Sequence, residues 1–307
     1  MKRDRNRSGQ TATTPDSAGI GQASPGLITA HHGIEVEVLF ATGKRRMVRV
    51  KRSSGHVVGD EVEVAGEVLR RLPRRTELRR RDGRGGIHLV AANLDVLGIV
   101  VAPNSLAGFI DRAIVAARAA ELQPFVVVNK CDLEDTAELL ADLQRIYAGS
   151  VPVFPLSAKK RTGLAPLQAF LHEGHRAVFV GSSGVGKSSL LNALCPAIDL
   201  KVGKVSDHSG LGRHTTTVST LHALSGGGEL VDTPGFRDFG LVDITAEELS
   251  CHFPGFEEHG EVRCRFRNCR HRTEPGCAVI RLVELGQIPA DRYNVYLELL
   301  AEVEAVR

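Results

Sequence analysis

Apolar and polar positions alternate over short stretches in the first third of the chain. This alternation predicts short β-strands in "GIEVEVLF", "RRMVRVKR" and "DEVEVAGEV", which turns such as "ATGK" separate. No long helical period interrupts them. Several short strands in one small region are typical of a barrel, and we expect an oligonucleotide/oligosaccharide-binding (OB) barrel over residues 25–91. The arginine-rich stretch from Arg70 to Arg84 is expected to form an exposed basic loop.

From about residue 92 the pattern changes to buried strands that alternate with amphipathic helices. Strands are predicted in "LDVLGIVVAP", "PFVVVNK", "VPVFPLSA", "HRAVFVG" and "GELVDTPGF". The stretches between them, such as "TAELLADLQRIYAG" and "GLAPLQAFLHEG", predict helices, and Ser105 is the expected N-cap of the first helix. Such alternation implies a parallel sheet with helices on both faces, so we expect an α/β domain over residues 92–246.

The two ends of the chain differ from this middle part. Residues 1–24 hold basic residues but no apolar segment, which excludes a secretory signal and predicts a disordered tail. That tail either contacts nucleic acid or has no role of its own. Residues 247–307 combine helical stretches with a cysteine-rich loop. No apolar run reaches the roughly 18–20 residues of a membrane span, so we expect no membrane contact.

Charge is unevenly distributed along the chain. Residues 1–90 contain 18 Lys and Arg against 10 Asp and Glu, a net charge of +8, while the whole chain has +3. The remaining residues therefore carry a net charge of −5. A basic N-terminal region predicts contact with a polyanion. The alternative is a basic surface that only contacts solvent.

Four of the six cysteines lie close together in the sequence, near residue 271. The spacing Cys264-x4-Cys269-x-His271-x5-Cys277 offers three thiolates and one imidazole, a complete tetrahedral set for a structural Zn²⁺. Clustering with a histidine, without a secretion signal, favours a metal site and a reducing cytoplasm over disulfides. Two alternatives remain, since Cys251 or His252 can replace one ligand and the cysteines can be free thiols.

A glycine-rich loop between a strand and a helix predicts a phosphate-binding P-loop. The motif is Gly181-x4-Gly186-Lys187-Ser188. Its backbone N–H groups and the helix N-terminus can surround phosphates, Lys187 supplies a cation, and the Ser188 hydroxyl is placed for Mg²⁺. The residues expected to contact the nucleotide here are Gly181, Ser182, Ser183, Gly184, Val185, Gly186, Lys187, Ser188 and Ser189.

A second motif, N-K-x-D, predicts that the base is guanine. It consists of Asn129, Lys130, Cys131 and Asp132. The Asp132 carboxylate can accept both the N1–H and the exocyclic N2–H of guanine, whereas adenine would leave that buried charge unpaired. The motif follows a strand, at the edge where such sheets bind ligands. After the next strand come Ser157, Ala158 and Lys159, whose backbone can bond the guanine carbonyl.

Two further segments are predicted to sense the γ-phosphate. In "DTPG", Asp232 can hold Mg²⁺ through water and the Gly235 N–H can meet the γ-phosphate. In "GRHTTT" a threonine can complete the Mg²⁺ shell. We name Thr216 as the candidate, although the pattern does not distinguish it from Thr215 or Thr217. The alternative for this stretch is a polar loop without a ligand.

The motifs follow one another in an unusual order along the chain. The base reader and the S-A-K stretch precede the P-loop, which is followed by the threonine segment and "DTPG". This order is a circular permutation of the usual GTPase order, and it leads the γ-phosphate sensor directly into the cysteine-rich region. In these motifs and in its metal spacing the chain resembles the RsgA family of circularly permuted GTPases that depend on the small ribosomal subunit. The resemblance covers roughly residues 25–300.

The resemblance implies an OB barrel, a central permuted G domain and a C-terminal zinc-knuckle domain. It also implies a cytoplasmic, monomeric GTPase that acts in late maturation of the small (30S) subunit. The family binds that subunit and its 16S rRNA in the GTP state and leaves after stimulated hydrolysis to GDP. An RNA-binding factor for which GTP is only a binding switch is the first alternative. A translation or membrane-trafficking GTPase is the second.

The catalytic machinery is incomplete by comparison with common GTPases. Phe236 stands where many GTPases have the glutamine that orients the attacking water. His214, beside the threonines, is the candidate for this role, and the family resemblance supports it at that motif. The alternative for His214 is a structural or RNA-facing role. Gly184 replaces the asparagine of potassium-activated GTPases, so we expect a weak intrinsic rate that the partner raises.

Overall fold

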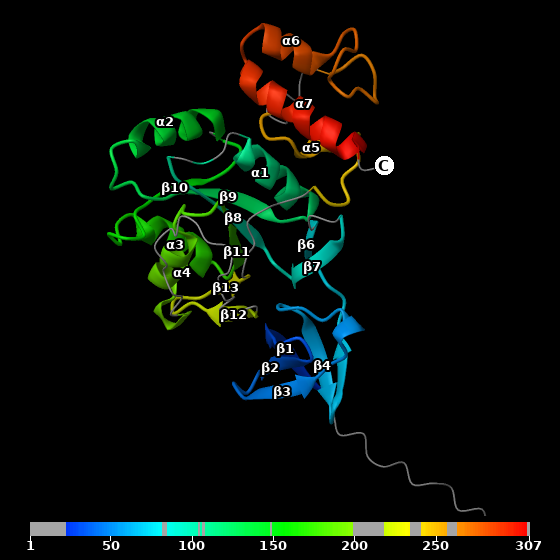
Figure 1. Ribbon diagram of the computed structural model, residues 1–307, viewed down its shortest axis with the longest axis vertical. Coiled ribbons are helices and arrows are strands. Elements are labelled where there is room, and N and C mark those ends of the chain that lie inside the picture. Colours follow the sequence, from blue (N-terminus) through cyan, green and yellow to red (C-terminus); the bar gives the residue numbers. More distant parts are fainter. Residues whose placement is uncertain are drawn as a thin grey trace, which may run out of the picture.

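The computed structural model describes residues 23–81, 85–103, 105, 108–147, 149–198, 218–233, 241–256 and 263–305. In Figure 1 the blue strands lie at one end of the molecule, and a sheet with green helices forms the middle. The orange and red helices lie at the other end. The chain therefore runs from a β-rich part through an α/β part to a helical part, in the order that the sequence predicts.

In the described part of the chain, five short antiparallel strands form the β-rich part. They are β1 (Ser24–His31), β2 (Glu35–Phe40), β3 (Arg45–Arg49), β4 (Glu61–Ala65) and β5 (Val68–Arg71), with the 3₁₀ turn η1 (Arg52–Ser54) after β3. β1 pairs with β2 and β4, β3 pairs with β2, and β5 pairs with β4. Alternate residues point inward and form one apolar cluster, which contains Ile28, Val36, Val38, Val48, Val62 and Val64. This arrangement agrees with the predicted OB-type barrel.

The arginine-rich segment contains a strand, so the expectation of an exposed loop was wrong. β6 (Glu77–Arg81) pairs with β7 (Ile87–Ala92) in a separate antiparallel hairpin. Leu78 is buried in the central core. The Arg74 side chain is only 8% exposed, and its guanidinium lies 2.6 Å from a carboxylate oxygen of the fully buried Asp60. The apolar position within the basic run therefore gives the segment one buried face.

Within the described residues, six strands form the sheet of the middle part. They are β8 (Val96–Val101), β9 (Gln123–Val128), β10 (Val153–Pro155), β11 (Arg176–Val180), β12 (Ser219–Ala223) and β13 (Glu229–Asp232). Their order across the sheet is β10-β9-β8-β11-β13-β12. All neighbouring pairs are parallel except β13 with β12. The predicted parallel sheet is confirmed, with one antiparallel strand added at its edge.

Helices cover both faces of this sheet. They are α1 (Phe109–Ala119), α2 (Thr136–Tyr147), α3 (Leu164–His172) and α4 (Lys187–Leu194), and the 3₁₀ turn η2 (Pro196–Ile198) follows α4. On β8, Leu97 and Ile99 join the core beneath α1 and α2, while Val96 and Val100 join the core beneath α3 and α4. Because successive strand residues point to opposite faces, the sheet is buried on both sides, as its continuous apolar strands require.

The middle sheet continues into the barrel. The end of β1 pairs with β12, with Ala30 opposite Thr220 and His31 opposite Ser219. The Arg176 guanidinium also donates to the carbonyl oxygens of Gly59 and Asn93, each at 3.2 Å. Main-chain and side-chain hydrogen bonds thus fix the barrel to the edge of the sheet.

Three helices lie within the described residues of the last part, and the first and third of them rest on α1. They are α5 (Leu249–His252), α6 (Ala278–Glu284) and α7 (Ala290–Ala305). Val115 of α1 shares an apolar cluster with Phe253 and Leu299. Beside it, the buried Arg292 of α7 donates to the buried Asp111 of α1 at 3.1 Å. Among the described helices, none combines the length and the apolar character that crossing a membrane requires.

Candidate functional site

The predicted nucleotide motifs come together at one edge of the middle sheet. The P-loop follows β11, the N-K-x-D motif follows β9, the S-A-K stretch follows β10, and "DTPG" begins at the end of β13. These strands are parallel, so their C-terminal ends lie at the same edge. The sheet therefore brings into one place motifs that are separated by as much as a hundred residues.

The P-loop has the close backbone approaches that its glycines allow. A Cβ atom on Gly181 would lie 2.4 Å from the Val100 carbonyl oxygen, and one on Gly186 would lie 2.3 Å from the Asn129 amide nitrogen. Gly186 also has a left-handed backbone (φ 96°) immediately before α4 begins at Lys187. The Lys187 ammonium donates to the carbonyls of Gly181 and Ser182. The cation therefore lies over the loop at a helix N-terminus, which suits an anion.

Asn129 is a brace between three loops. Its buried side-chain amide donates to the Val185 carbonyl in the P-loop at 2.8 Å. Its side-chain oxygen accepts the backbone N–H of Ala158 at 3.0 Å. The next residue, Lys130, adopts a left-handed backbone with φ 68°, and its carbonyl accepts the Thr136 hydroxyl at 2.9 Å. These contacts fix the base-reading loop against both neighbouring motifs.

Asp132 is held as an ionised acceptor. The Ser157 hydroxyl donates to Asp132 Oδ1 at 2.5 Å, and this bond lowers the pKa of that carboxyl below its ordinary value. Ser157 Oγ in turn accepts the backbone N–H of Lys160 at 3.1 Å. The sequence predicted only backbone contacts for the S-A-K stretch and missed this positioning role of the Ser157 side chain. Cys131, the residue before Asp132, is exposed.

The end of β13 presents a partly buried acidic group. Burial raises the pKa of Asp232, and no cationic side chain is recorded beside it among the described residues. The neighbouring Thr233 hydroxyl is buried and has no hydrogen-bond partner in the described part of the chain. Ser188 lies one residue inside α4, on an adjacent strand–helix connection. A divalent cation would favour the ionised form of Asp232 and offset the effect of burial on its pKa, so these oxygen donors fit Mg²⁺.

Three predicted site residues, His214, Thr216 and Gly235, lie outside the described residues. The same holds for Phe236 and for the other threonines of "GRHTTT". Their roles in hydrolysis and in Mg²⁺ binding stay predictions. The remaining predicted nucleotide contacts all lie within the four loops above.

The four predicted metal ligands form one cluster. The donor atoms of Cys264, Cys269, His271 and Cys277 all lie within 4.8 Å of one another. Three of the separations are 3.5 Å for Cys264 Sγ to His271 Nδ1, 3.3 Å for His271 Nδ1 to Cys277 Sγ, and 4.0 Å between the two sulfurs. Ligands bound to one tetrahedral zinc lie roughly 3.5–3.8 Å apart, so the cluster can hold a metal ion.

The surroundings of this cluster support the same ligand set. Burial raises the pKa of the Cys269 thiol to about 12, and a bound cation reverses such a shift by stabilising the thiolate. Tyr293 donates to the His271 carbonyl at 2.6 Å, which ties the ligand loop to α7. Cys251 and His252 do not join the cluster. The alternative ligand set that the sequence left open therefore finds no support among the described residues.

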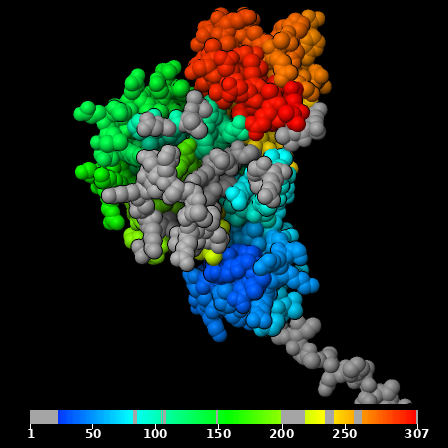
Figure 2. Space-filling view, viewed as in Figure 1, coloured from blue at the N-terminus to red at the C-terminus, as the bar shows by residue number. Residues whose placement is uncertain are grey.

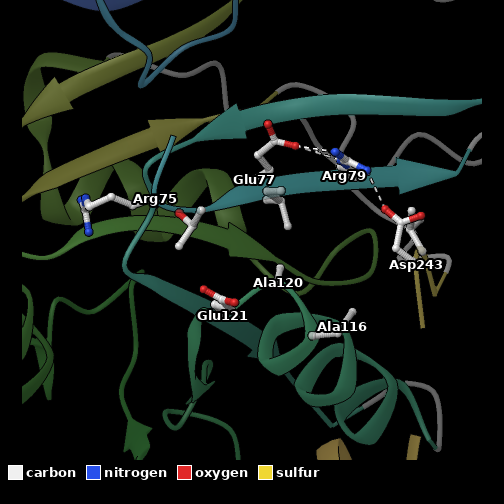
Figure 3. Close-up of a pocket in the computed structure, with 11 residues that line it drawn as sticks. Arg75, Glu77, Arg79, Ala116, Ala120, Glu121 and Asp243 are labelled. Atoms are coloured by element: carbon white, nitrogen blue, oxygen red, sulfur yellow. Dashed lines mark hydrogen bonds and ion pairs between the residues drawn. The ribbon is translucent and has the colours of Figure 1, made fainter. Parts of the chain in front are cut away.

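A separate hollow of about 290 Å³ lies away from the nucleotide edge. Figure 3 shows it between β6, the C-terminal half of α1 and residues 242–243. Because α1 ends just before β9 begins, this hollow is near the opposite edge of the sheet. Arg79 spans its rim, since it pairs with Glu77 at 2.5 Å and with Asp243 at 2.6 Å. Both acidic and basic side chains line the hollow, which lies where the β6–β7 hairpin meets α1 and residues 242–243.

The fold and the site together define a circularly permuted P-loop GTPase. Its base-reading strand precedes the phosphate-binding strand in the chain, while the strand ends meet as the site requires. The family model for the RsgA GTPase matches residues 71–242. The chain belongs to the RsgA GTPase family and is a GTP-hydrolysing enzyme.

Relatives and solved structures agree with this assignment. "Small ribosomal subunit biogenesis GTPase RsgA" of Pseudomonas fluorescens strain SBW25 is 41% identical over 303 residues, covering 92% of this chain and 87% of the relative. The protein of the same name from Azotobacter vinelandii is 40% identical, with the same coverage. YjeQ from Thermotoga maritima matches with a TM-score of 0.75 and 32% identity over 93% of this chain and all of that one. YloQ, described as a circularly permuted GTPase, matches with a TM-score of 0.70 and 28% identity over 95% and 99%.

Proposed function

We propose that this GTPase acts in maturation of the small ribosomal subunit. The observation that carries the proposal is 40–41% identity, over 92% of the chain, to proteins named for biogenesis of that subunit. In this proposal the protein binds the subunit in its GTP state and is released as GDP forms. Its partners are the subunit and its 16S rRNA, and it works as a cytoplasmic monomer.

Within the nucleotide site we assign roles from the contacts described above. Asp132 accepts the two N–H groups on the Watson–Crick edge of guanine, and Ser157 holds that carboxylate in place. Lys187 and the P-loop N–H groups bind the phosphates. Ser188, Asp232 and Thr216 are the proposed Mg²⁺ contacts, and the ion neutralises negative charge on the phosphate oxygens when bound. Gly235 is the proposed γ-phosphate donor. His214 is the proposed group that orients the attacking water.

The metal in the cysteine cluster is proposed to be one structural Zn²⁺. Three thiolates and one imidazole suit zinc, and four protein ligands leave no open coordination position. The site therefore supplies folding free energy to residues 263–305 and performs no chemistry.

An RNA partner is supported by charge on the barrel. Arg49 and Arg52 are exposed there, and the contact of Arg49 with Glu35 is long, at 3.5 Å. Exposed cations on an OB-type barrel suit a phosphate backbone.

Turnover with purified ribosomal subunits tests the proposed function. We expect GTP hydrolysis to be slow for the protein alone, unchanged by large subunits and raised at least about tenfold by small subunits. A binding switch with incidental hydrolysis would show nucleotide-dependent subunit binding without stimulated turnover. Equal rates in the three conditions would contradict the proposal.

A further inference from the structure

The loop that carries the metal ligands also displays an aromatic ring to solvent. Phe266 is 41% exposed, although Cys264 and Cys269 on either side are held in the cluster. The Arg265 guanidinium lies 5.5 Å from the centroid of this ring, within cation–π distance. The orange loop beside α6 lies at the end of the molecule away from the barrel (Figures 1 and 2).

The arginines of this loop fall into two groups, and the first holds the loop to the helices. Arg270 pairs with Glu304 of α7 at 2.7 Å and with Glu247 at 2.8 Å. Arg272 pairs with the second oxygen of Glu304 at 2.8 Å. These two guanidinium groups are engaged inside the protein, so they are not free for a polyanion.

The second group surrounds the exposed ring. Arg263, Arg265 and Arg267 are exposed, and no ion pair joins them to another described residue. Alternate positions of the loop thus carry a cation, with Phe266 between them. An exposed apolar ring costs solvation free energy. Because this ring lies among cations that form no ion pair within the described residues, its position points to a ligand that has both flat apolar faces and negative charge.

The loop is fixed before any ligand arrives. The Arg265 backbone N–H donates to the Gly276 carbonyl at 3.1 Å, and the Ala278 N–H donates to Cys264 Sγ at 3.3 Å. The Arg265 side chain also lies against Gly276, since a Cβ there would be 3.1 Å from Arg265 Cβ. A ring presented by such a closed loop loses little conformational entropy on binding.

We propose that residues 263–268, the Phe266 platform, stack one unpaired RNA base, while Arg263 and Arg267 contact the flanking phosphates. The inference rests on the proposed function and names the RNA feature that this part of the protein recognises. Bases within a duplex are covered by their neighbours, whereas unpaired bases offer both faces to aromatic side chains and arginine planes. An acidic protein segment would satisfy the arginines but would offer no equivalent planar group.

Binding of variants to purified small subunits gives the first test. With a non-hydrolysable GTP analogue, Phe266→Ala is expected to weaken binding on the order of tenfold, the usual effect of losing one stacked base. Phe266→Tyr keeps a planar ring and is expected to bind within about threefold of the unchanged protein. Zinc content equal to that of the unchanged protein shows that the loop is intact in each variant. Unchanged affinity of Phe266→Ala overturns the proposal.

A fluorescent reporter gives the second test, because the chain contains no tryptophan. Phe266→Trp places one indole in the platform, and Leu285→Trp places one at another exposed apolar position of the same part, where Leu285 is 61% exposed. Titration with single-stranded oligoadenylate RNA is expected to quench the first protein saturably and to leave the second nearly unchanged. Absence of quenching in Phe266→Trp overturns the proposal. If Phe266→Ala weakens subunit binding but RNA does not quench Phe266→Trp, the platform contacts a ribosomal protein, and the proposal of a stacked RNA base is still wrong.

The two readouts separate this inference from the proposed function. If small subunits stimulate turnover of the unchanged protein but the Phe266→Trp protein is not quenched, only the platform proposal fails. If small subunits neither bind nor stimulate the unchanged protein, the proposed function fails first, and the platform proposal falls with it.

Discussion

The side-chain amide of Asn129 donates to the Val185 carbonyl at 2.8 Å, across 56 residues of the chain. One residue opens the base-reading motif and the other lies inside the P-loop. The contact requires only that β9 and β11, on either side of β8, end at the same edge of the sheet, and it does not depend on which strand comes first. This is why the site tolerates a permuted order: the sheet restores the adjacency that the sequence has rearranged.

Asn129→Ala is expected to weaken both the fold and nucleotide binding. The change leaves the Val185 carbonyl and the Ala158 N–H without their partners in a buried place. Two such groups cost roughly 2–4 kcal/mol of unfolding free energy, and GTP affinity should fall at least about tenfold. Urea unfolding and titration with a fluorescent GTP analogue measure the two effects. Asp142→Asn is the control, because its exposed pair with Arg145 on α2 lies outside the four nucleotide loops. Wild-type affinity in Asn129→Ala would remove the brace from the mechanism.

Asp132→Asn is expected to change which base is bound. An amide N–H can donate to the 2-carbonyl of xanthine but cannot accept the N2–H of guanine, so xanthosine triphosphate should replace GTP as the preferred nucleotide. Competition binding with both nucleotides measures the preference. Ser157→Ala removes the hydroxyl that holds Asp132. It should weaken GTP binding without changing the preference. If Asp132→Asn still binds GTP more tightly than xanthosine triphosphate, as Ser157→Ala is expected to, the assignment of Asp132 as the base reader is wrong.

Cys269→Ser is expected to lose the metal and to loosen the last part of the chain. A serine hydroxyl is a poor zinc ligand, and binding free energy at such a site is largely folding free energy. Metal analysis and limited proteolysis of residues 263–305 measure the two effects. Cys251→Ser is the control, because Cys251 is exposed and lies outside the cluster. Stoichiometric zinc in Cys269→Ser, or equal zinc loss in the control, would point to another ligand set.

Sequence periodicity predicted the α/β core and the motif positions well, because buried parallel strands need continuous apolar runs. It missed β1, whose sequence contains Pro25 and Gly26. That glycine is required by packing, since a Cβ there would be 2.4 Å from Val38 Cγ1. A glycine that is needed for contact with another strand disfavours the β-strand prediction locally, because its reason lies in packing that the local sequence does not show.

Helix ends and long-range polar contacts could not be predicted from the sequence either. Ser105 was expected to cap α1, but the helix begins at Phe109 and Gly108 is its N-cap. The Ser105 hydroxyl instead accepts the backbone N–H of Ala102 at 2.9 Å. The buried pair of Asp111 and Arg292 joins residues 181 apart, and no local pattern indicates it. The limits of the three parts stay predictions.

Arg292→Met is expected to destabilise the contact between the last helices and α1. Arg292 donates to Asp111 and to the Pro254 carbonyl, and Tyr147 donates to Asp111 at 2.9 Å. Removing the cation leaves a buried carboxylate, which typically costs about 3–5 kcal/mol. The double variant with Asp111→Leu removes that charge and should recover part of the loss. Urea unfolding of the single and double variants measures the coupling, and additive effects would show that the pair is not coupled.

We expect the nucleotide state to affect contacts outside the sheet, through the residues that follow "DTPG". Leu241 is buried in the cluster beneath α7, and Asp243 pairs with Arg79 of the hairpin at 2.6 Å (Figure 3). The permutation therefore leads the γ-phosphate sensor into contacts with the last helices and with the β6–β7 hairpin. If GTP orders this segment, as it does in other GTPase switches, subunit affinity should be higher with a non-hydrolysable GTP analogue than with GDP.

Asp243→Asn is expected to reduce that difference without unfolding the protein. Both partners are about half exposed, at 43% for Arg79 and 57% for Asp243, so the pair contributes only about 0–1 kcal/mol. A ligand shifts an equilibrium only by its differential affinity, so losing the pair can change the ratio of the two subunit affinities by at most about fivefold. Small-subunit binding in both nucleotide states measures the ratio, and the melting temperature should stay nearly constant. Asp142→Asn is the matched control. It breaks an exposed ion pair with Arg145 on α2, and that pair contacts neither the β6–β7 hairpin nor residues 241–243. An unchanged ratio in Asp243→Asn, or an equal change in the control, would show that this pair does not transmit the nucleotide state.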